Sequence, residues 1–470
     1  DWMYYDIVKP GGGFSYHWKR VRRALEELGP TFVKLGQVLS TRPDLIPMEY
    51  ARALAHLQDR VEPFPFDEVA RIVSSETGGR LEDVFRSFDQ TPVAAASIAQ
   101  GHHAVLPDGT EVFVKVQRPG IEATIAVDLE IMLHLAALLE HHSSEISFLK
   151  PTRIVDEFRR TLEREIDFTI EAANADRFAR QFAGDPTIRV PRVFHELTTS
   201  KVITQEYIRG IKVSQREQLE AAGCNLKEIA ARGANLLMRQ FFEHGFFHAD
   251  PHPGNVYVLP GDVVCYVDFG MMGRIALSER EHFADLLGLA VTRDERRAVR
   301  VLLGLTLWED EPDHGRLERD LADFIDDHLY RPVAHLDVPK MLQEVYLLCL
   351  HHGLALRPHI YLLMKTLGAV DEMGRQLDPE FRIIDHLAPF VRRLQRRRLS
   401  PLRLLRQAAQ TGGEAAGLLQ DLPGEIRTVF RQVREGKVKV EFEHRGLESM
   451  LHTHSRMSNQ IGRASCRERV

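Results

Sequence analysis

Hydrophobic and polar residues alternate along Glu111–Val116 (EVFVKV), and this period of two predicts a strand with one buried face. A short strand is also predicted just before it, at Ala104–Leu106. Residues 107–110 (PDGT) separate the two, and their Pro and Gly preset the backbone angles of a tight turn. The same arrangement recurs at Val256–Leu259 and Val263–Val267, two β-branched runs joined by PGD at 260–262. The pattern therefore predicts two β-hairpins, far apart in the chain.

Apolar residues recur every four positions between Arg153 and Phe182, which predicts one long amphipathic helix. These positions are Ile154, Phe158, Leu162, Ile166 and Ile170. Another helix is predicted to begin at Pro30, because the missing N–H of a proline is harmless in the first turn, and to end at the RP of 42–43. Apolar-rich helices of a core are predicted further on, at Leu286–Leu307, Leu342–Leu356 and Ile360–Val370.

The composition is that of a globular protein. The chain has 470 residues, 44% of them hydrophobic, and a net charge of −6, which suits two or three domains. Nothing in this balance points to nucleic acid as a partner. The cysteines (Cys224, Cys265, Cys349 and Cys466) form no C-x-x-C pair, so we expect free thiols in a reducing compartment. The sequence contains no secretory signal and no apolar run of the roughly 18 residues needed to span a bilayer.

The segments on either side of the second hairpin carry the residue types that phosphoryl transfer requires. His248, Asp250 and Asn255 (in HADPHPGN) match the kinase catalytic loop H-R-D-x-x-x-x-N, with Ala249 in place of Arg. In that loop the Asp is the base and the Asn binds Mg²⁺. Asp268 follows in an Asp-Phe-Gly triplet, whose Asp holds the metal ions that bridge the phosphates. We therefore predict an ATP site with Asp250 as the catalytic base and with Asn255 and Asp268 as Mg²⁺ ligands.

Lys115 lies in the alternating strand upstream, where kinases place the Lys that pairs with nucleotide phosphates. Such a Lys needs a carboxylate to orient it. On the predicted helix, Asp167 and Glu171 are four residues apart and share a face, whereas Glu165 points elsewhere. We assign Glu171 to an ion pair with Lys115.

An alanine-rich loop stands where kinases have the G-x-G-x-x-G loop that covers the phosphates. Alanine does not readily reach positive φ and favours helix, so we expect a stiffer loop that grips the phosphates differently. After a strand at Lys201–Ile203, residues 204–210 (TQEYIRG) fit the interlobe hinge, where Glu206 and Ile208 would meet adenine through backbone groups. The predicted nucleotide-binding residues of the loop are Val93, Ala94, Ala95, Ala96, Ser97, Ile98, Ala99, Gln100 and Gly101.

Together these motifs resemble the AarF/UbiB family of atypical kinase-like proteins. The resemblance runs from about Leu25 to about Leu447. Besides the motifs above, it includes a K-x-G-Q signature at Lys34, Gly36 and Gln37 and an E-x-D signature at Glu165 and Asp167. One departure is GH at 101–102, where family members commonly have Val-His. We expect this Gly to relax the loop slightly without abolishing binding.

The resemblance implies an α+β, bilobal protein-kinase-like fold, with a helical N-terminal extension over the cleft and a helical C-terminal tail. Lys34 and Gln37 would point inward from the extension, where a protein substrate would otherwise lie, and Glu165 is the expected partner of Lys34. With Asp167, these residues are expected to be regulatory. The expected divisions are the extension (1–90), the N-lobe (91–205), the C-lobe (206–390) and a basic helical tail (391–460).

The resemblance also implies an ATPase or small-molecule kinase, with ATP and Mg²⁺ as cofactors, that supports ubiquinone (quinone) biosynthesis or lipid metabolism. Expected partners are ATP, a quinone or lipid precursor or a quinone-biosynthesis protein complex, and an anionic membrane surface. Asp250 would deprotonate either a hydroxyl or a water. One alternative is a phosphotransferase of the aminoglycoside or choline kinase type, whose loops often read H-x-D-x-H-x-G-N. The other is a catalytically idle scaffold, which would not need a complete metal site.

Both ends of the chain carry information about the natural protein. The first residue is not Met, and the last ten, IGRASCRERV (461–470), look like a translated sequencing adapter, so we expect the natural C-terminus to be missing. Seven arginines between Arg392 and Arg406 alternate with valine and leucine. Such a segment either lies on an anionic membrane or packs as a solvated helix against the C-lobe. Because family members often end in membrane-spanning helices, we expect a cytoplasmic, membrane-associated protein.

Overall fold

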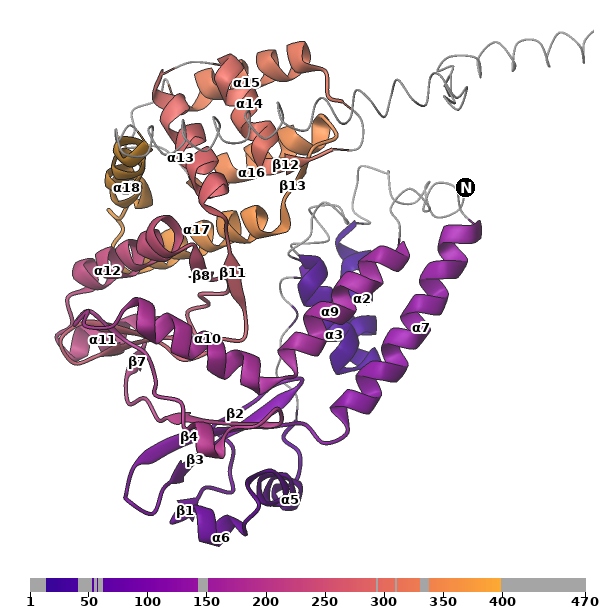
Figure 1. Ribbon diagram of the computed structural model, residues 1–470, viewed down its shortest axis with the longest axis vertical. Helices are drawn as coiled ribbons and strands as arrows, with labels where there is room; N and C mark the ends of the chain where they lie inside the picture. Colours follow the sequence, from indigo (N-terminus) through magenta and orange to yellow (C-terminus); the bar gives the residue numbers. More distant parts are fainter. Residues whose placement is uncertain are drawn as a thin grey trace, which may run out of the picture. The chain divides into compact units, whose positions relative to one another are not determined.

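An antiparallel sheet forms the core of the N-lobe (Figure 1). The structure is a computed structural model that describes residues 14–40, 53–54, 57, 62–142, 151–292, 295–308, 311–329 and 338–398. Among these residues the sheet has five strands in the order β1-β3-β4-β6, with β2 paired to β3. Their bounds are Ser87–Phe88 (β1), Ala94–Ala95 (β2), Ala99–Val105 (β3), Glu111–Gln117 (β4) and Val202–Glu206 (β6).

The first predicted hairpin is confirmed as β3 and β4. Its turn is closed by the Leu106 N–H, which donates to the Thr110 carbonyl at 2.8 Å, and Gly109 takes the positive φ of +89° that the turn requires. Strand β3 begins before the predicted Ala104, because its first residues pair with β2 as well as with β4.

The two faces of β4 have different environments. Val112, Val114 and Val116 are completely buried, in a cluster that they share with helix α5 (Phe66–Thr77). Phe113 and Lys115 lie on the other face and are only partly buried. The alternation read from the sequence therefore separates a face that packs in the core from the face that carries Lys115.

The predicted single helix over Arg153–Phe182 is wrong: the structure has two helices, α9 (Pro151–Glu165) and α10 (Phe168–Gln181). Between them Asp167 is extended, and its carboxylate accepts the Thr169 N–H at 3.0 Å as the N-cap of α10. The side chain of Gln117 donates to the Ile166 carbonyl at 2.9 Å, which the break leaves without a helical partner. The four-residue apolar period continues across the break, so the period could not reveal where the first helix ends.

The second predicted hairpin is also confirmed, in the sheet of the C-lobe. Strands β9 (Val256–Leu259) and β10 (Val263–Tyr266) pair across a turn in which Gly261 and Asp262 take φ of +81° and +58°. Strands β5 (Ile188–Arg189) and β7 (Ile211–Lys212) flank this hairpin. The catalytic-loop segment runs between two further paired strands, β8 (Phe246–His248) and β11 (Met272–Arg274).

Helices make up the rest of the C-lobe, and their buried aliphatic side chains join one large core. The predicted helix Leu286–Leu307 is divided between two helices and a short strand, β12 (Thr306–Leu307), which pairs with β13 (Ala355–Leu356). The helices are α11 (Arg216–Ala221), α12 (Leu226–Met238), α13 (Leu277–Thr292), α14 (Glu295–Leu305), α15 (His314–Leu329), α16 (Val338–His351), α17 (Pro358–Leu377) and α18 (Ile383–Arg398). Cys224, Cys265 and Cys349 are free thiols, as predicted, and Cys466 lies outside the described residues.

The helical N-terminal extension comprises α2 (Phe14–Leu28) and α3 (Pro30–Ser40), and α3 contacts α7 (Ile121–His142) and α9 (Figure 1). Pro30 is the first residue of α3, as predicted. Gly36 lies so close to Leu57 that an added Cβ would come within 2.2 Å of its Cδ1 atom, so the K-x-G-Q glycine provides room for packing within the extension.

The basic segment that was predicted to be a membrane-binding or C-lobe helix is described only at its beginning. Val391 and Leu394 are buried in the C-lobe core, and Arg393 donates to Glu243 at 2.8 Å, so this part of α18 packs against the C-lobe. The side chains beyond Leu394, and all residues after Arg398 with the adapter-like end, lie outside the described residues. None of the described helices is long and apolar enough to cross a membrane.

The N-cap at Asp167 generates a prediction about stability. Asp167→Ala leaves the Thr169 N–H without its acceptor and should lower the free energy of unfolding, measured with urea, by about 1 kcal/mol. Asp167→Asn keeps an acceptor oxygen and should lower it by less. Equal losses in the two variants would show that the cap is not what Asp167 contributes.

Candidate active site

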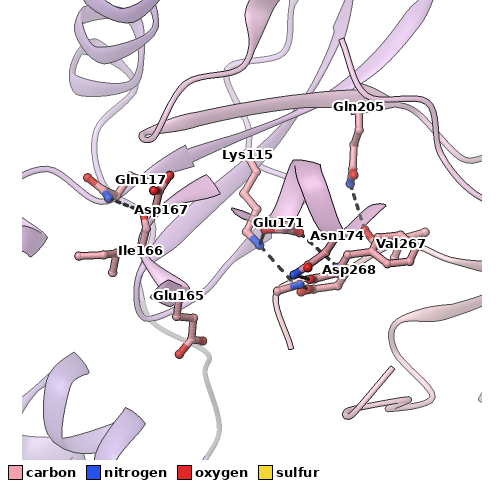
Figure 2. A network of polar contacts seen from close by, with 12 residues as sticks. Lys115, Gln117, Glu165, Ile166, Asp167, Glu171, Asn174, Gln205, Val267 and Asp268 are labelled. Atoms are coloured by element: carbon pink, nitrogen blue, oxygen red, sulfur yellow. Dashed lines mark hydrogen bonds and ion pairs between the residues drawn. The ribbon is translucent and has the colours of Figure 1, made fainter. Parts of the chain in front are cut away.

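Lys115 lies between two carboxylates that come from different parts of the chain (Figure 2). Its Nζ atom is 2.8 Å from Oε2 of Glu171 on α10 and 3.9 Å from Oδ2 of Asp268, which follows β10. The Glu171 side chain is only 6% exposed and that of Lys115 19%. The structure therefore brings together the Lys, the carboxylate assigned to it and the Asp of the Asp-Phe-Gly triplet.

The charges of this cluster influence one another strongly. Burial lowers the pKa of Lys115, but Asp268 and Glu171 outweigh it and hold that pKa above its ordinary value. Burial raises the pKa of Glu171 in spite of Lys115. Burial would raise the pKa of Asp268 too, yet Lys115 and the Gly270 N–H bring it below its usual range. Asp268 therefore stays ionised at neutral pH, as a carboxylate that holds a cation must.

His248 fixes the catalytic loop against the Asp-Phe-Gly segment. Its Nδ1 atom accepts the Asp250 N–H at 3.3 Å, so Nε2 carries the proton and donates to the backbone carbonyl of Asp268. Burial lowers the pKa of His248, which keeps the ring neutral in this tautomer. The ring of Tyr266 stacks on it at 4.8 Å between centroids. The histidine of the catalytic loop is thus a structural link between Asp250 and Asp268.

Asn255 is placed by the hairpin directly opposite the residue before Asp268. Its carbonyl accepts the Val267 N–H at 3.1 Å, extending the β9–β10 ladder by one step. Behind the loop, the buried Thr366 hydroxyl on α17 donates to the carbonyl of Ala249 at 3.2 Å. The backbone that carries Asp250 and Asn255 is therefore held from both sides.

Two residues that sequence reasoning missed brace the Asp-Phe-Gly segment. The buried Asn174 amide donates to the Phe269 carbonyl at 3.0 Å, and the Gln205 amide donates to the Val267 carbonyl at 3.1 Å (Figure 2). Asn174 lies three residues after Glu171, on the same face of α10, and that spacing was the available signal. Sequence reasoning assigns Gln205 to the hinge segment 204–210, whereas the structure places it in β6, and no local pattern indicates that its side chain reaches Val267.

An ion pair between Lys34 and Glu165 links the extension to this cluster. Nζ of Lys34 pairs with Glu165, and Lys34 also contributes to the lowered pKa of Asp268. In Figure 2 Glu165 points away from Lys115, so the two glutamates that flank the helix break serve different lysines. Gln37 does not join them: its amide donates to the Leu57 carbonyl at 3.4 Å, within the extension.

The alanine-rich loop forms a hairpin, although its composition favours a helix. Ala94 and Ala95 of β2 pair with Gly101 and Gln100, and the Ala96 N–H donates to the Ala99 carbonyl at 2.8 Å. Pairing with β3 therefore overrides the helix propensity of alanine. At the turn the Ser97 side chain is fully buried, and its hydroxyl has no hydrogen-bond partner within the described part of the chain.

The hinge residues have separate roles. Glu206 pairs with Arg189 at 2.8 Å through its side chain, and its N–H donates to the Arg192 carbonyl at 2.8 Å. The Tyr207 N–H donates to the Glu111 carbonyl. Ile208 lies in the turn between β6 and β7, and no hydrogen bond between the described residues uses its N–H.

This fold and site define an atypical kinase-like protein. Residues 56–302 match the ABC1 atypical kinase-like domain, and residues 321–382 match the UbiB helical domain. The chain belongs to this ABC1 (UbiB) family, as the motifs predicted.

Relatives of the family match most of the chain. The probable protein kinase UbiB of Cellvibrio japonicus is 35% identical over 459 residues, which cover 96% of this chain and 82% of the relative. The probable protein kinase UbiB of Marinobacter nauticus is 36% identical over 82% of this chain and 72% of its own length. The Synechocystis protein sll1770 is 34% identical over 92% of this chain and 75% of its own.

A solved structure shares the fold. The Rv3197–erythromycin complex from Mycobacterium tuberculosis aligns with a TM-score of 0.54 and 25% identity, over 78% of this chain and 93% of that protein. The predicted bilobal kinase-like fold is therefore confirmed.

The ion pairs around Lys115 predict that the effects of substituting Lys115 and Glu171 on stability are coupled. Lys115→Met leaves two carboxylates without their cation and should lower the free energy of unfolding by roughly 3 kcal/mol. Adding Glu171→Gln should recover most of this loss in urea denaturation, because it removes the stranded buried charge. Lys201→Met, which breaks the exposed ion pair with Glu122, is the control and should change stability by less than about 0.5 kcal/mol. A double variant no more stable than Lys115→Met would contradict the coupling.

Proposed function

We propose that this protein binds ATP with Mg²⁺ and acts as a kinase or ATPase that supports ubiquinone (quinone) biosynthesis or lipid metabolism. The observation that carries the proposal is the position of Lys115, whose Nζ lies 2.8 Å from Glu171 and 3.9 Å from Asp268. In kinases the equivalent Lys–Glu pair and Asp must both be in place for phosphoryl transfer.

Each residue has a role in this proposal. Lys115, oriented by Glu171, contacts phosphate oxygens, and Asp268 and Asn255 supply oxygen ligands for Mg²⁺. Asp250 accepts a proton from the attacking hydroxyl or water. Bound Mg²⁺ would neutralise charge on the phosphates.

The side chains at hand suit this ligand. Asp268 is ionised, and its side chain is 41% exposed, so it can reach a metal ion. No three His, Cys, Asp or Glu side chains among the described residues converge on a metal site of their own. This agrees with Mg²⁺, which usually takes one or two protein oxygens together with phosphates and water. The Ile208 N–H, in a partly exposed residue, is a hydrogen-bond donor that a nucleotide could use at the hinge.

The family and the extension support a proposal about the substrate class. Relatives bear the name probable protein kinase UbiB, yet the extension docks close to Asp268 through the ion pair between Lys34 and Glu165. We therefore favour a small hydrophobic substrate, a quinone or lipid precursor, met alone or in a quinone-biosynthesis protein complex at an anionic membrane surface. Family membership gives no support to a phosphotransferase of the aminoglycoside or choline kinase type.

The metal role of Asp268 is tested by nucleotide binding. Mg²⁺-ATP should raise the melting temperature of the unaltered chain, and Asp268→Asn should remove most of that rise while leaving the melting temperature without nucleotide nearly unchanged. The exposed Asp83→Asn variant is the control and should respond to nucleotide like the unaltered chain. Equal nucleotide stabilisation in Asp268→Asn would contradict the assignment. An unaltered chain that no nucleotide stabilises would favour the idle scaffold.

Because of the N-terminal extension, we predict little phosphate transfer to protein substrates. With Lys34 paired to Glu165, a generic protein such as casein should receive negligible phosphate from radiolabelled ATP. Lys34→Met loosens α3 and should raise that transfer, whereas Lys227→Met, which removes an exposed ion pair with Glu380, should not. Robust casein phosphorylation by the unaltered chain would overturn the proposed substrate class.

A further inference from the structure

Phe113 is a partly buried aromatic residue on the face of β4 that also carries Lys115. Two neighbours establish where this face points. Lys115, two residues further along the strand, reaches Asp268, and Gln205, directly opposite Phe113 on β6, donates to the carbonyl of Val267. Phe113 therefore faces the same site as the residues that surround Asp268.

The ring of Phe113 packs over Gly101. In the β3–β4 pair Phe113 lies opposite His103, and Gly101 is its diagonal neighbour, opposite Lys115. Diagonal neighbours on one face of a sheet are within reach of an aromatic side chain. A Cβ atom added to Gly101 would come within 2.1 Å of Cζ of Phe113. The ring thus occupies the space that a side chain at position 101 would fill.

Compared with the kinase motifs, this chain has a smaller residue on β3 and a larger side chain on β4. Residues 94–101 (AAASIAQG) align with the kinase pattern G-x-G-x-x-G-x-V, and residues 112–115 (VFVK) align with V-A-I-K. Kinases therefore have Val and Ala where this chain has Gly101 and Phe113. The two changes depend on each other, because Val at 101 would collide with the ring and Ala at 113 would leave Gly101 uncovered.

The ring of Phe113 is not part of the hydrophobic core. It belongs to neither of the hydrophobic clusters that meet at this sheet, and no other aromatic ring of the described residues packs on it. A single partly exposed aromatic residue is ordinary on a surface. Here, however, it lies two residues along β4 from the lysine proposed to bind phosphate and opposite Gln205, near the end of β6 that leads into the hinge. The base of a nucleotide that contacts both Lys115 and the hinge would lie over this part of the sheet.

We propose that the ring of Phe113, supported by Gly101, is the surface on which the base of the nucleotide stacks, and that it selects a purine nucleoside triphosphate. This inference rests on the proposed function. A planar base gains more from an aromatic face than from the edge of an aliphatic side chain. A purine covers more of the ring than a pyrimidine does, so the preference for ATP over CTP depends on Phe113.

Calorimetric titration of the full chain with Mg²⁺-ATP, Mg²⁺-CTP and Mg²⁺-tripolyphosphate tests the inference. Phe113→Leu keeps an apolar side chain but removes the flat ring, and it should weaken ATP binding about tenfold and reduce the preference for ATP over CTP. Tripolyphosphate, which has no base, should bind equally to both proteins. The double variant Gly101→Val with Phe113→Ala restores the kinase pair and should regain part of the ATP affinity. Melting temperatures measured without ligand verify that the variants are folded.

The outcomes separate this inference from the proposed function. ATP binding unchanged in Phe113→Leu, or tripolyphosphate binding lost to the same extent as ATP binding, would overturn the stacking role and leave the phosphate site intact. A folded, unaltered chain that binds neither ATP nor tripolyphosphate would overturn the proposed function together with this inference.

Discussion

The placement of Lys115 between Glu171 and Asp268 is the interaction on which the rest of the site depends. It connects strand β4 of the N-lobe, helix α10, which begins after the helix break at Asp167, and the loop after the C-lobe hairpin. Partly buried charges of this kind are costly unless they are paired, so each of the three segments must be held in place. The amides of Asn174 and Gln205 and the ring of His248 meet that requirement by binding successive carbonyls around Asp268.

The paired charges around Lys115 leave the cluster with a negative formal charge, as the Mg²⁺ of the proposed function would require. Lys34 and Lys115 face three carboxylates, those of Glu165, Glu171 and Asp268, so the formal charge is one unit negative. Lys34 belongs to the extension, and its charge also acts on Asp268. Under the proposed function, the docking of the extension and the affinity for Mg²⁺ should therefore be coupled through electrostatics.

Residue spacing predicted the parts of the site that depend on local structure. The two hairpins and the order of Lys115, Asp250, Asn255 and Asp268 follow from alternation, turn residues and motif spacing. The break at Asp167 could not be predicted from the apolar period, because Ile166 and Ile170 continue it across the break. The roles of Gln205 and of Phe113 on Gly101 could not be predicted either, because they arise from strand register across a sheet. The pairing of Lys34 with Glu165 came from the family resemblance, since no local pattern connects such distant residues.

A crystal structure with Mg²⁺ and a non-hydrolysable ATP analogue tests the central claim most directly. The account predicts a metal ion about 2.1 Å from oxygens of Asp268 and Asn255, with Nζ of Lys115 within hydrogen-bonding distance of a phosphate oxygen and still paired with Glu171. A nucleotide bound away from Lys115, or a metal ion held without Asp268, would contradict it.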